Sequence, residues 1–348
     1  MSESPKRLFF VISGEHDTLP SAELRAILSS EKIPFNTVHS TSKLLVIDAP
    51  SVALNAISER SLMAESCGTV ILETSTRESL IQELGGSRLS ECKVEGESFV
   101  VRSLRVSGSD KRLRRDKLER DIGAVLLSAA GNTKVSLKNP DKTFLAILSP
   151  GRITFGVIHT RRRKGEIHAR RPRKRPFFHP STMQPKLARC MVNLARARPG
   201  GLLLDPFCGA GGHLIEGALI GCRILGLDIS DRMIRGTKKN LKGFGLQADG
   251  LVKADARYLP FSHVDSIVTD MPYGRASSTA GLDREYLVNA FLKNASRTLN
   301  PGQYACVATF SPLDINQPES CGFLLEESYQ VYVHRSLTRH ISVLRREA

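Results

Sequence analysis

The chain of 348 residues is longer than one ordinary hydrophobic core supports and fits two or three domains. Its hydrophobic content of 41% and charged content of 24% are those of a folded globular protein and exclude a largely disordered chain. Because 50 Lys and Arg stand against 35 Asp and Glu, the formal net charge is +15, which favours a polyanionic partner, either a nucleic acid or an anionic membrane surface.

The excess positive charge is concentrated in two segments. Residues 161–175 contain nine Lys and Arg and a single acid, Glu166, for a net charge of +8. Residues 102–120 contain eight Lys and Arg against three acids, for a net charge of +5. Thirteen of the fifteen net charges therefore lie in these two segments, and the rest of the chain is nearly neutral.

The sequence contains no recognisable membrane or export signal. No run of about 18 apolar residues predicts a membrane span, and residues 1–13 lack the apolar core and the small-residue cleavage site of a signal peptide. The seven cysteines are scattered, odd in number and form no Cys-x-x-Cys pair. We therefore expect a cytoplasmic protein with free thiols, no metal site and no membrane association.

The first 160 residues show α+β patterning. Apolar runs predict strands, Ser21 is an N-cap signal, and the second predicted helix is amphipathic. In chain order the predicted elements are a strand at 7–13, a helix at 21–31, strands at 43–48 and 99–106, a helix at 116–131, and two or three strands within 134–158. This order predicts one sheet with helices on a face.

A compositional break follows at about 160–178. Three prolines, Pro172, Pro176 and Pro180, lie among or just after the arginines of the basic segment. Proline interrupts regular structure, and a dense run of like charges does not form a core. The segment is therefore the clearest candidate for a basic linker between the two halves of the chain.

After Pro180 short apolar strands alternate strictly with helices. The predicted strands lie at 202–205, 223–228, 265–270 and 303–310, with a further short strand, the third in chain order, just before Asp255. The predicted helices lie at 212–221, 231–243 and 282–299. Alternating units of this kind predict a parallel, doubly wound α/β sheet. Residues 331–346 look like a closing antiparallel edge strand.

An acidic side chain stands at or just after the end of four successive strands of this sheet: Asp205, Asp228, Asp255 and Asp270. In doubly wound sheets ligands bind outside the carboxyl ends of the strands, so these acids are the first candidates for a binding site. Each acid alone is more often a helix cap or a solvated loop residue. That interpretation explains poorly why acids recur at successive strand ends.

The loop after the first of these strands, Asp-Pro-Phe-Cys-Gly-Ala-Gly-Gly-His at 205–213, is rich in glycine and opens a helix. It departs from the dinucleotide pattern Gly-x-Gly-x-x-Gly because Leu214 stands where the third glycine is required. An acid directly before the loop would repel a pyrophosphate but suits a cationic or zwitterionic ligand. Asp228 could accept hydrogen bonds from ribose hydroxyls, and Asp255 could meet an adenine amine. A simple glycine turn between strand and helix is the alternative.

The fourth strand ends in Asp270-Met271-Pro272-Tyr273. After three such strand ends, this sequence resembles the [DNS]-P-P-[YFW] motif of class I S-adenosylmethionine-dependent methyltransferases that methylate exocyclic amines of bases. An exocyclic amine is a poor nucleophile because its lone pair is delocalised into the ring. Asp270 and the carbonyl next to Pro272 can accept its N–H bonds while Tyr273 stacks on the base, so that the amine attacks the methyl group in line.

Cys208 raises a competing mechanism, because C5 methylation of pyrimidines uses a cysteine nucleophile. Its position in the glycine-rich loop, and not beside Pro272, favours a packed free thiol. Methylation of an amine requires no covalent intermediate.

Five motifs in order extend the resemblance to the archaeal and eukaryotic tRNA (guanine-10-N2) methyltransferase family. They are the helix-opening stretch at 178–195, DPFCGAGGHLIEGALIG at 205–221, GLDIS at 226–230, KADARYLP at 253–260 and DMPYGR at 270–275. The first half resembles the family's THUMP domain more weakly, through Phe99, Arg102, Arg105, Leu118, Glu119, Gly123 and Asn139-Pro140-Asp141. The resemblance implies an N-terminal ferredoxin-like domain at 1–60, a THUMP RNA-binding domain at 61–160, a basic linker at 161–178 and a Rossmann-like class I methyltransferase domain at 179–348.

The resemblance also implies the chemistry. The expected reaction transfers methyl from S-adenosylmethionine to N2 of a tRNA guanine at position 10, once or twice, with the acceptor stem held by the THUMP region and the guanine flipped into the catalytic domain. Asp270, Pro272 and Tyr273 would hold the guanine amine, and Met271 departs from the usual proline of the motif. The cofactor residues implied are His179, Thr182, Asp205, Phe207, Gly209, Gly211, Asp228, Ile229, Asp255 and Ala256.

Phosphate contacts are expected from the two basic segments. A charge run is ordinarily a solvated face, but a run between an RNA-binding and a catalytic module favours contact with RNA, and arginine suits bidentate phosphate contacts. The candidates are Arg112, Arg114, Arg115, Lys117, Arg161, Arg162, Arg163, Lys164, Arg170, Arg171, Arg173, Lys174 and Arg175.

Several alternatives stay open at this point. The same chemistry could act on another tRNA guanine, such as position 6, or on N6 of adenine. A non-catalytic RNA-binding protein with a degenerate methyltransferase fold belongs to a different class. Some members of the family work with a small zinc-ribbon activator protein, so such a partner is also a possibility.

Overall fold

The computed structural model describes residues 4–92, 94–129, 132–161, 164–272, 283–314, 316–335 and 337–347, without the side chains of residues 129, 164, 166 and 284. Three predicted site residues, Tyr273, Arg162 and Arg163, lie outside the described residues, as does the side chain of Lys164. The chain divides into two compact units. Unit 1 takes Met1–Ser21, Ile33–Ser58 and Ala64–Arg162, and unit 2 takes Ala22–Lys32, Glu59–Met63 and Arg163–Ala348.

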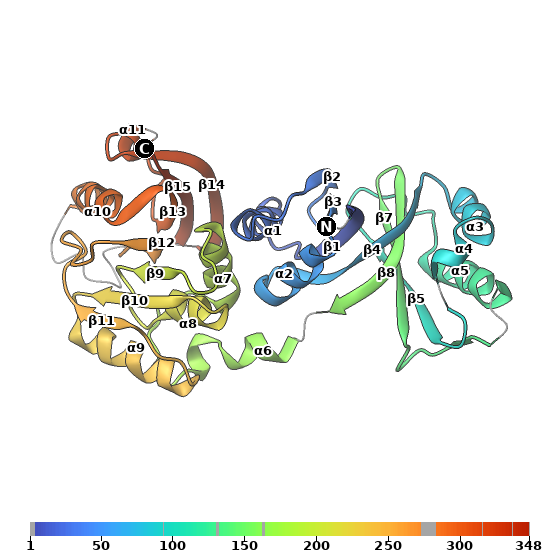
Figure 1. The fold of residues 1–348 in the computed structure, drawn as a ribbon, viewed down its shortest axis with the longest axis horizontal. Helices are drawn as coiled ribbons and strands as arrows, with labels where there is room; N and C mark the ends of the chain where they lie inside the picture. Colours follow the sequence, from blue (N-terminus) through green and yellow to red (C-terminus); the bar gives the residue numbers. More distant parts are fainter. Residues whose placement is uncertain are drawn as a thin grey trace. The chain divides into compact units, whose positions relative to one another are not determined.

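Unit 1 is built on a mixed sheet that has eight strands among the described residues, in the order β2-β3-β1-β4-β8-β7-β5-β6 (Figure 1). The strands are β1 (Lys6–Ile12), β2 (Asn36–Ser40), β3 (Leu44–Ala49), β4 (Ala64–Thr74), β5 (Ser98–Arg105), β6 (Lys134–Val135), β7 (Lys142–Ser149) and β8 (Arg152–Arg161). The helices of this part of the chain are α1 (Leu19–Ser30), α2 (Val52–Arg60), α3 (Arg77–Gly85), α4 (Leu89–Cys92) and α5 (Arg115–Ala129). β5 runs parallel to β6 and β7, and the other neighbouring strands are antiparallel.

The apolar runs predicted β1, β3 and β5, and the helical spacing predicted α1 and α5; all five elements are confirmed with slightly different bounds. β2 and β4 were not predicted, because β2 has no buried residue and β4 mixes buried, partly buried and exposed positions. β4 pairs with β1 on one side and with β8 on the other, so one sheet continues through residues 6–161. The assignment of ferredoxin-like and THUMP domains stays a prediction.

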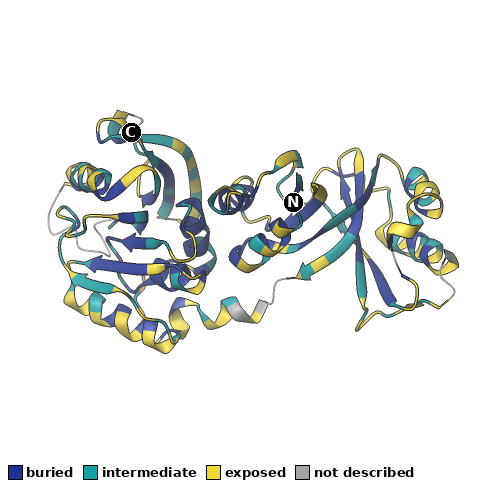
Figure 2. Cartoon of the chain, in the orientation of Figure 1, coloured by how far each residue is buried: buried dark blue, intermediate teal, exposed yellow. Residues whose placement is uncertain are grey.

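The core of this sheet lies under α3 and α5. Leu80 and Leu84 of α3 pack with Leu118 and Ile122 of α5 against the aromatic side chains of β5, β7 and β8. There the rings of Phe144 and Phe155 stack with their centroids 5.6 Å apart. Figure 2 shows the strands as mostly buried and the outer faces of the helices as exposed. No described helix is long and apolar enough to cross a membrane.

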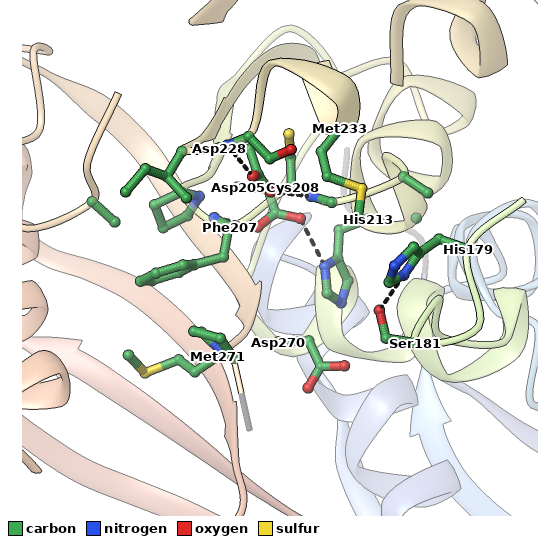
Figure 3. Close-up of a pocket in the computed structure, with 18 of the residues that line it drawn as sticks. His179, Ser181, Asp205, Phe207, Cys208, His213, Asp228, Met233, Asp270 and Met271 are labelled. Carbon is green, nitrogen blue, oxygen red and sulfur yellow. Dashed lines mark hydrogen bonds and ion pairs between the residues drawn. The ribbon is translucent and has the colours of Figure 1, made fainter. Parts of the chain in front are cut away.

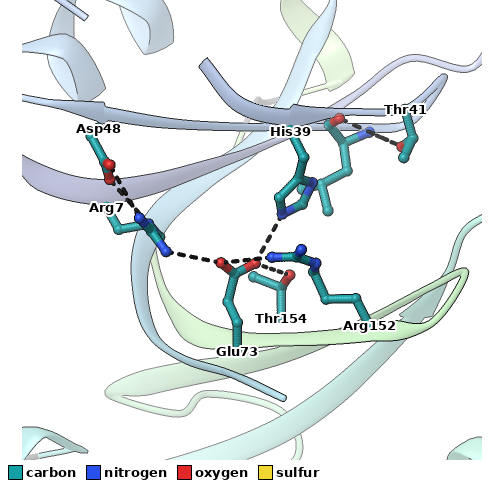
Figure 4. Close-up of polar contacts among 8 residues, drawn as sticks. Arg7, His39, Thr41, Asp48, Glu73, Arg152 and Thr154 are labelled. Carbon is teal, nitrogen blue, oxygen red and sulfur yellow. Dashed lines mark hydrogen bonds and ion pairs between the residues drawn. The ribbon is translucent and has the colours of Figure 1, made fainter. Parts of the chain in front are cut away.

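A polar cluster ties four strands of the same sheet together around Glu73 (Figure 4). The Glu73 carboxylate on β4 accepts hydrogen bonds from His39 of β2 at 2.9 Å and from Thr154 of β8 at 2.8 Å, and it pairs with Arg7 and Arg152 at 3.3 Å each. Burial raises the pKa of Glu73, but these donors and charges outweigh it and lower the pKa to about 2. This cluster is structural and involves no predicted site residue.

Unit 2 contains a second sheet, which has seven strands in the part of the chain that the structure describes, in the order β11-β10-β9-β12-β13-β15-β14. The strands are β9 (Leu202–Asp205), β10 (Arg223–Asp228), β11 (Gly250–Lys253), β12 (Val264–Asp270), β13 (Leu299–Thr309), β14 (Phe323–His334) and β15 (Leu337–Arg346). The helices are α6 (Lys164–Ala169), a 3-10 turn (Pro172–Lys174), α7 (Pro185–Leu194), α8 (Gly212–Leu219), α9 (Asp231–Gly243), α10 (Arg284–Thr298) and α11 (Asn316–Glu319). The five strands β9 to β13 all run parallel to one another, which confirms the predicted doubly wound sheet.

The predicted edge strand at 331–346 needs a correction. The structure forms two antiparallel strands there, and β15 lies between β13 and β14, so that β14 is the edge. β14 was missed because buried, partly buried and exposed positions alternate along it, and its sequence therefore shows no apolar run.

The predicted linker also needs a correction in its second half. Phe177 donates its backbone N–H to Asn240 Oδ1 at 2.7 Å and accepts from Asn240 Nδ2 at 2.9 Å, so this segment is bonded to α9. Pro172 and Arg175 are buried. Pro172 and Phe177 pack into unit 2, so this part of the predicted linker belongs to the fold of that unit.

A buried polar network joins residues 22–32 and 59–63 to α7 within unit 2. Asn193 donates to Glu23 Oε1 at 2.9 Å and accepts from Arg60 Nη2 at 3.1 Å, and Arg189 donates to the Arg60 carbonyl at 3.1 Å. Ser61 donates to the second Glu23 oxygen at 2.5 Å. α1 is thus bonded to the helix that precedes the first strand of the second sheet.

Candidate active site

A cavity of about 270 Å³ lies at the carboxyl ends of β9, β10, β11 and β12 in unit 2 (Figure 3). The structure brings together in its lining most of the predicted residues: His179, Thr182, Asp205, Phe207, Gly209, Asp228, Ile229, Asp255, Ala256, Asp270 and Pro272. Gly211 is not among the lining residues. Lining residues that the sequence did not single out include Ser181, His213 and Met233.

The glycine-rich loop between β9 and α8 needs glycine for backbone reasons. Gly209 has φ +51° and Gly211 has φ +77°, a region that other residues rarely adopt. A Cβ on Gly211 would also stand 2.9 Å from Thr237 Cγ2. Gly209 donates its N–H to Asp228 Oδ2 at 2.9 Å, and Thr237 donates to the Gly209 carbonyl at 2.7 Å. The loop is therefore fixed by β10 and α9 before any ligand binds.

Asp205 is only 1% exposed, and its two oxygens are used by the protein. Oδ2 pairs with His213 Nδ1 at 2.9 Å, and Oδ1 accepts from Thr269 at 2.9 Å and from the Phe207 N–H at 3.2 Å. His213 Nε2 is buried without a hydrogen-bond partner among the described residues. Asp205 therefore orients His213 in the wall of the cavity, next to His179 and Ser181 in Figure 3.

The next two acids differ in their environment. Asp228 is bonded to the N–H groups of Gly209 and of Ser230, the latter at 2.8 Å, and burial raises its pKa. Asp255 is more exposed and is paired with Arg257 at 2.6 Å, which lowers its pKa. Both carboxylates are held in place after successive strands and line the same cavity.

Asp270, at the end of β12, is bonded to a residue that the sequence did not suggest. Arg339 of β15 donates to Asp270 through Nε at 3.1 Å and through Nη2 at 2.9 Å, both to Oδ2. Burial raises the pKa of Asp270, and the Arg339 charge opposes this rise. No local signal could have revealed Arg339, because it lies 69 residues away and arrives through the pairing of β13 with β15.

Met271 is buried, and its side chain packs with the core of unit 2 among Leu287 and Phe291. Its N–H donates to the Ala308 carbonyl at 3.0 Å, a bond that a proline at this position could not form. Met271 is therefore bonded to β13, and Asp270 and Pro272 on either side of it both line the cavity.

Cys208 does not have the environment of a nucleophile. Its thiol is buried, and burial together with the charges of Asp205 and Asp228 raises its pKa well above the ordinary value. All seven cysteines are buried free thiols.

The predicted phosphate-binding residues fall into two groups. Arg112, Arg114, Arg115, Lys117, Arg161, Arg171, Arg173 and Lys174 are exposed. Arg170 pairs with the buried Glu216 at 3.0 Å, and Arg175 is 5% exposed. For these last two the surface assignment is corrected, because their side chains are directed into unit 2.

When its strands are numbered in chain order from β9, the second sheet has the order 3-2-1-4-5-7-6. Its seventh strand, β15, runs in the opposite direction to the others. With a glycine-rich loop after its first strand and acids at the ends of the next strands, it defines a class I S-adenosylmethionine-dependent methyltransferase.

Comparison with known proteins narrows this class. Residues 172–340 match the RMKL-like methyltransferase domain family. The tRNA (guanine(10)-N2)-dimethyltransferase of Methanothermobacter thermautotrophicus is 40% identical over 347 residues, covering 97% of this chain and 99% of that protein. The enzyme of the same name from Methanocaldococcus jannaschii is 31% identical over 363 residues, with 97% and 99% covered. The crystal structure of TrmN from Thermus thermophilus shares the fold with a TM-score of 0.55 at 23% identity, over 98% of this chain and 99% of that one. The chain belongs to the tRNA (guanine-10-N2) methyltransferase family, as its motifs indicated.

Proposed function

We propose that this enzyme transfers methyl groups from S-adenosylmethionine to N2 of guanine at position 10 of tRNA. The observation that supports it most is the cavity of unit 2, where Asp270 and Pro272 line the same space as Asp228 and Asp255. The amine acceptor and the cofactor acids thus share one cavity, and the relatives that span the whole chain are named for this reaction.

The residues fit the cofactor chemically. Asp228 offers a carboxylate to the ribose hydroxyls, Ala256 and Ile229 offer apolar surface to the adenine, and His179 and Thr182 line the same cavity from the segment that precedes α7. When bound, S-adenosylmethionine supplies an electrophilic methyl group on a sulfonium centre.

The substrate side follows from the chemistry of the amine. Asp270 accepts an N–H bond from N2 and takes up the proton that the amine loses as its new N–C bond forms. Arg339 opposes the rise in the pKa of this buried carboxyl and fixes its orientation. Tyr273, outside the described residues, would stack on the guanine as the motif implies. The surrounding cavity excludes water and aligns the amine for in-line attack.

The tRNA itself would be held by unit 1. A hollow of about 540 Å³ there is lined by five cationic side chains, Arg77, Arg112, Arg114, Lys117 and Arg152, against Glu78 and Asp110. The hydroxyls of Ser109 and Ser149 in the same hollow are buried with no hydrogen-bond partner among the described residues. Such a basic, donor-rich hollow suits a phosphate backbone, and we assign it to the RNA-binding region expected at 61–160.

Nucleoside mass spectrometry of unmodified tRNA after reaction tests the proposal. We expect N2-methylguanosine or its dimethyl form, mapped to position 10, and a loss of about 10²- to 10³-fold in kcat for Asp270→Asn, the range for removing one preorganised group. Asp231→Asn, an exposed acid of α9 that pairs with Arg235, is the matched control and should keep full activity. A methyladenosine product, or methylation at position 6 only, would refute the assignment.

Two further points stay predictions of the same proposal. We place the enzyme in the cytoplasm, with its tRNA substrate. A need for the zinc-ribbon activator would be contradicted if the purified chain alone methylated tRNA at full rate.

A further inference from the structure

One cation inside unit 2 has an unusual environment. Arg175 is 5% exposed, and its Nε donates to the Arg170 carbonyl at 2.9 Å. Its other two nitrogens, Nη1 and Nη2, are buried and have no hydrogen-bond partner among the described residues. A buried guanidinium with two unused donors is costly unless an anion arrives to accept from them.

The neighbouring acid, Glu216, does not accept hydrogen bonds from these two nitrogens. Glu216 is fully buried, and its oxygens pair with Arg170 Nε at 3.0 Å and Arg189 Nη2 at 2.9 Å. Glu216 attracts Arg175 as well, but burial dominates and lowers the pKa of Arg175 to about 10. Three guanidinium groups therefore surround Glu216; Glu23 also attracts Arg189, but Nη1 and Nη2 of Arg175 have no acceptor among the described residues.

The unused donors lie beside the cofactor cavity. A Cβ built on Gly212 would stand 3.7 Å from Arg175 Nη1 and 3.9 Å from Thr182 Cγ2. Gly212 is the first residue of α8, and both Gly212 and Thr182 line the cavity. The N-terminus of a helix attracts anions through its free N–H groups. The helix end and the guanidinium thus favour an anion at the same place.

We propose that Arg175 binds the α-carboxylate of the methionyl part of S-adenosylmethionine. The carboxylate is the one anionic group of this cofactor, whose sulfonium and ammonium groups are cationic and whose adenosine is neutral. A phosphate of the tRNA is disfavoured, because Arg175 is buried within unit 2. The proposal rests on the methyltransferase class and not on the tRNA position. It moves Arg175 from the expected RNA contacts to the cofactor site.

Calorimetry without tRNA tests the proposal. S-adenosylhomocysteine is compared with S-adenosyl-3-thiopropylamine, which lacks only the carboxylate. We expect the wild-type protein to bind the former about 10- to 100-fold more tightly, the range of a charged hydrogen bond. Arg175→Met should reduce this preference to less than about threefold while still binding the decarboxylated compound. Arg173→Met, two residues away and exposed, should keep the wild-type preference.

Three results would overturn the assignment: a wild-type protein that binds both compounds equally, an Arg175→Met variant with undiminished preference, or the same loss in Arg173→Met. If Arg175→Met does not fold, Arg175→Lys keeps a charge but loses the fork of donors, and its preference must fall as well. Since no methyl acceptor is present, a failure here is distinguishable from a failure of the tRNA assignment.

Discussion

At the scale of single residues, the pairing of Asp270 with Arg339 affects the pKa of the proposed amine acceptor. Burial alone would keep Asp270 protonated over a wider pH range, and a protonated carboxyl is a poor acceptor for an amine. Arg339 opposes this effect from β15 with a two-nitrogen contact to Oδ2. Arg339 acts through Asp270 and is therefore a positioning residue.

Arg339→Met should shift the pH dependence of methyl transfer. Because the pKa of Asp270 is already raised, activity should rise with pH through that pKa and be lost as pH falls below it. Without Arg339 the pKa rises further, so kcat/KM should fall about tenfold for each unit by which it exceeds the assay pH.

The measurement is a pH–rate profile of methyl transfer for the wild type, Arg339→Met and Arg339→Lys. The lysine variant keeps the charge and should restore part of the profile. Arg335→Met, at an exposed arginine directly after β14, should leave it unchanged. A midpoint in Arg339→Met equal to that of the wild type would exclude the positioning role.

At the scale of elements, sequence patterns predicted what depends on neighbouring residues in the chain. The acids at the ends of β9, β10 and β12 could be found because strict alternation of strands and helices fixes where each strand ends. His213, Arg339 and the buried state of Arg175 could not be found in this way. Each depends on which helix or strand packs beside another, and no periodicity of the sequence records that.

The network around Asn193 is a second feature that only packing creates. Asn193 is fully buried and joins α7 to Glu23 of α1 and to Arg60. Burial raises the pKa of Glu23, and the hydrogen bonds from Ser61 and Asn193 oppose this rise. The helix before the first strand of the catalytic sheet is therefore stabilised by residues from the beginning of the chain.

Asn193→Ala should destabilise unit 2 by about 2–4 kcal/mol, because it leaves buried polar and charged groups with fewer partners. Denaturant unfolding followed by circular dichroism measures the change. Asn55→Ala, at an exposed position of α2, is the control and should alter the free energy of unfolding by less than about 0.5 kcal/mol. If Asn193→Ala alters the free energy of unfolding as little as this control does, the network contributes nothing to stability.

At the scale of the whole molecule, the Lys and Arg residues that give the net charge of +15 have different roles. Arg170, Arg175 and Arg189 serve the interior of unit 2, whereas Arg112, Arg114 and Lys117 are exposed at the hollow of unit 1. Arg112 and Arg114 pair with Asp110 and Asp116, but pairs this exposed are worth little in water and exchange readily for phosphate. Only part of the formal charge is therefore available to RNA.

Replacing Arg112, Arg114 and Lys117 together by glutamine should weaken tRNA binding and reduce its salt dependence. Removing one cation from a phosphate lowers the slope of log K against log salt by about 0.7–0.9, so removing three should lower it by about 2–3. Filter binding between low and moderate salt measures the slope, and calorimetry with S-adenosylhomocysteine should show unchanged cofactor affinity. The matched control replaces Lys238, Lys239 and Lys242, three exposed lysines of α9. If the slope falls equally in the two triple variants, tRNA binding depends only on net charge. If it falls only in the variant of Arg112, Arg114 and Lys117, the hollow of unit 1 binds the phosphate backbone.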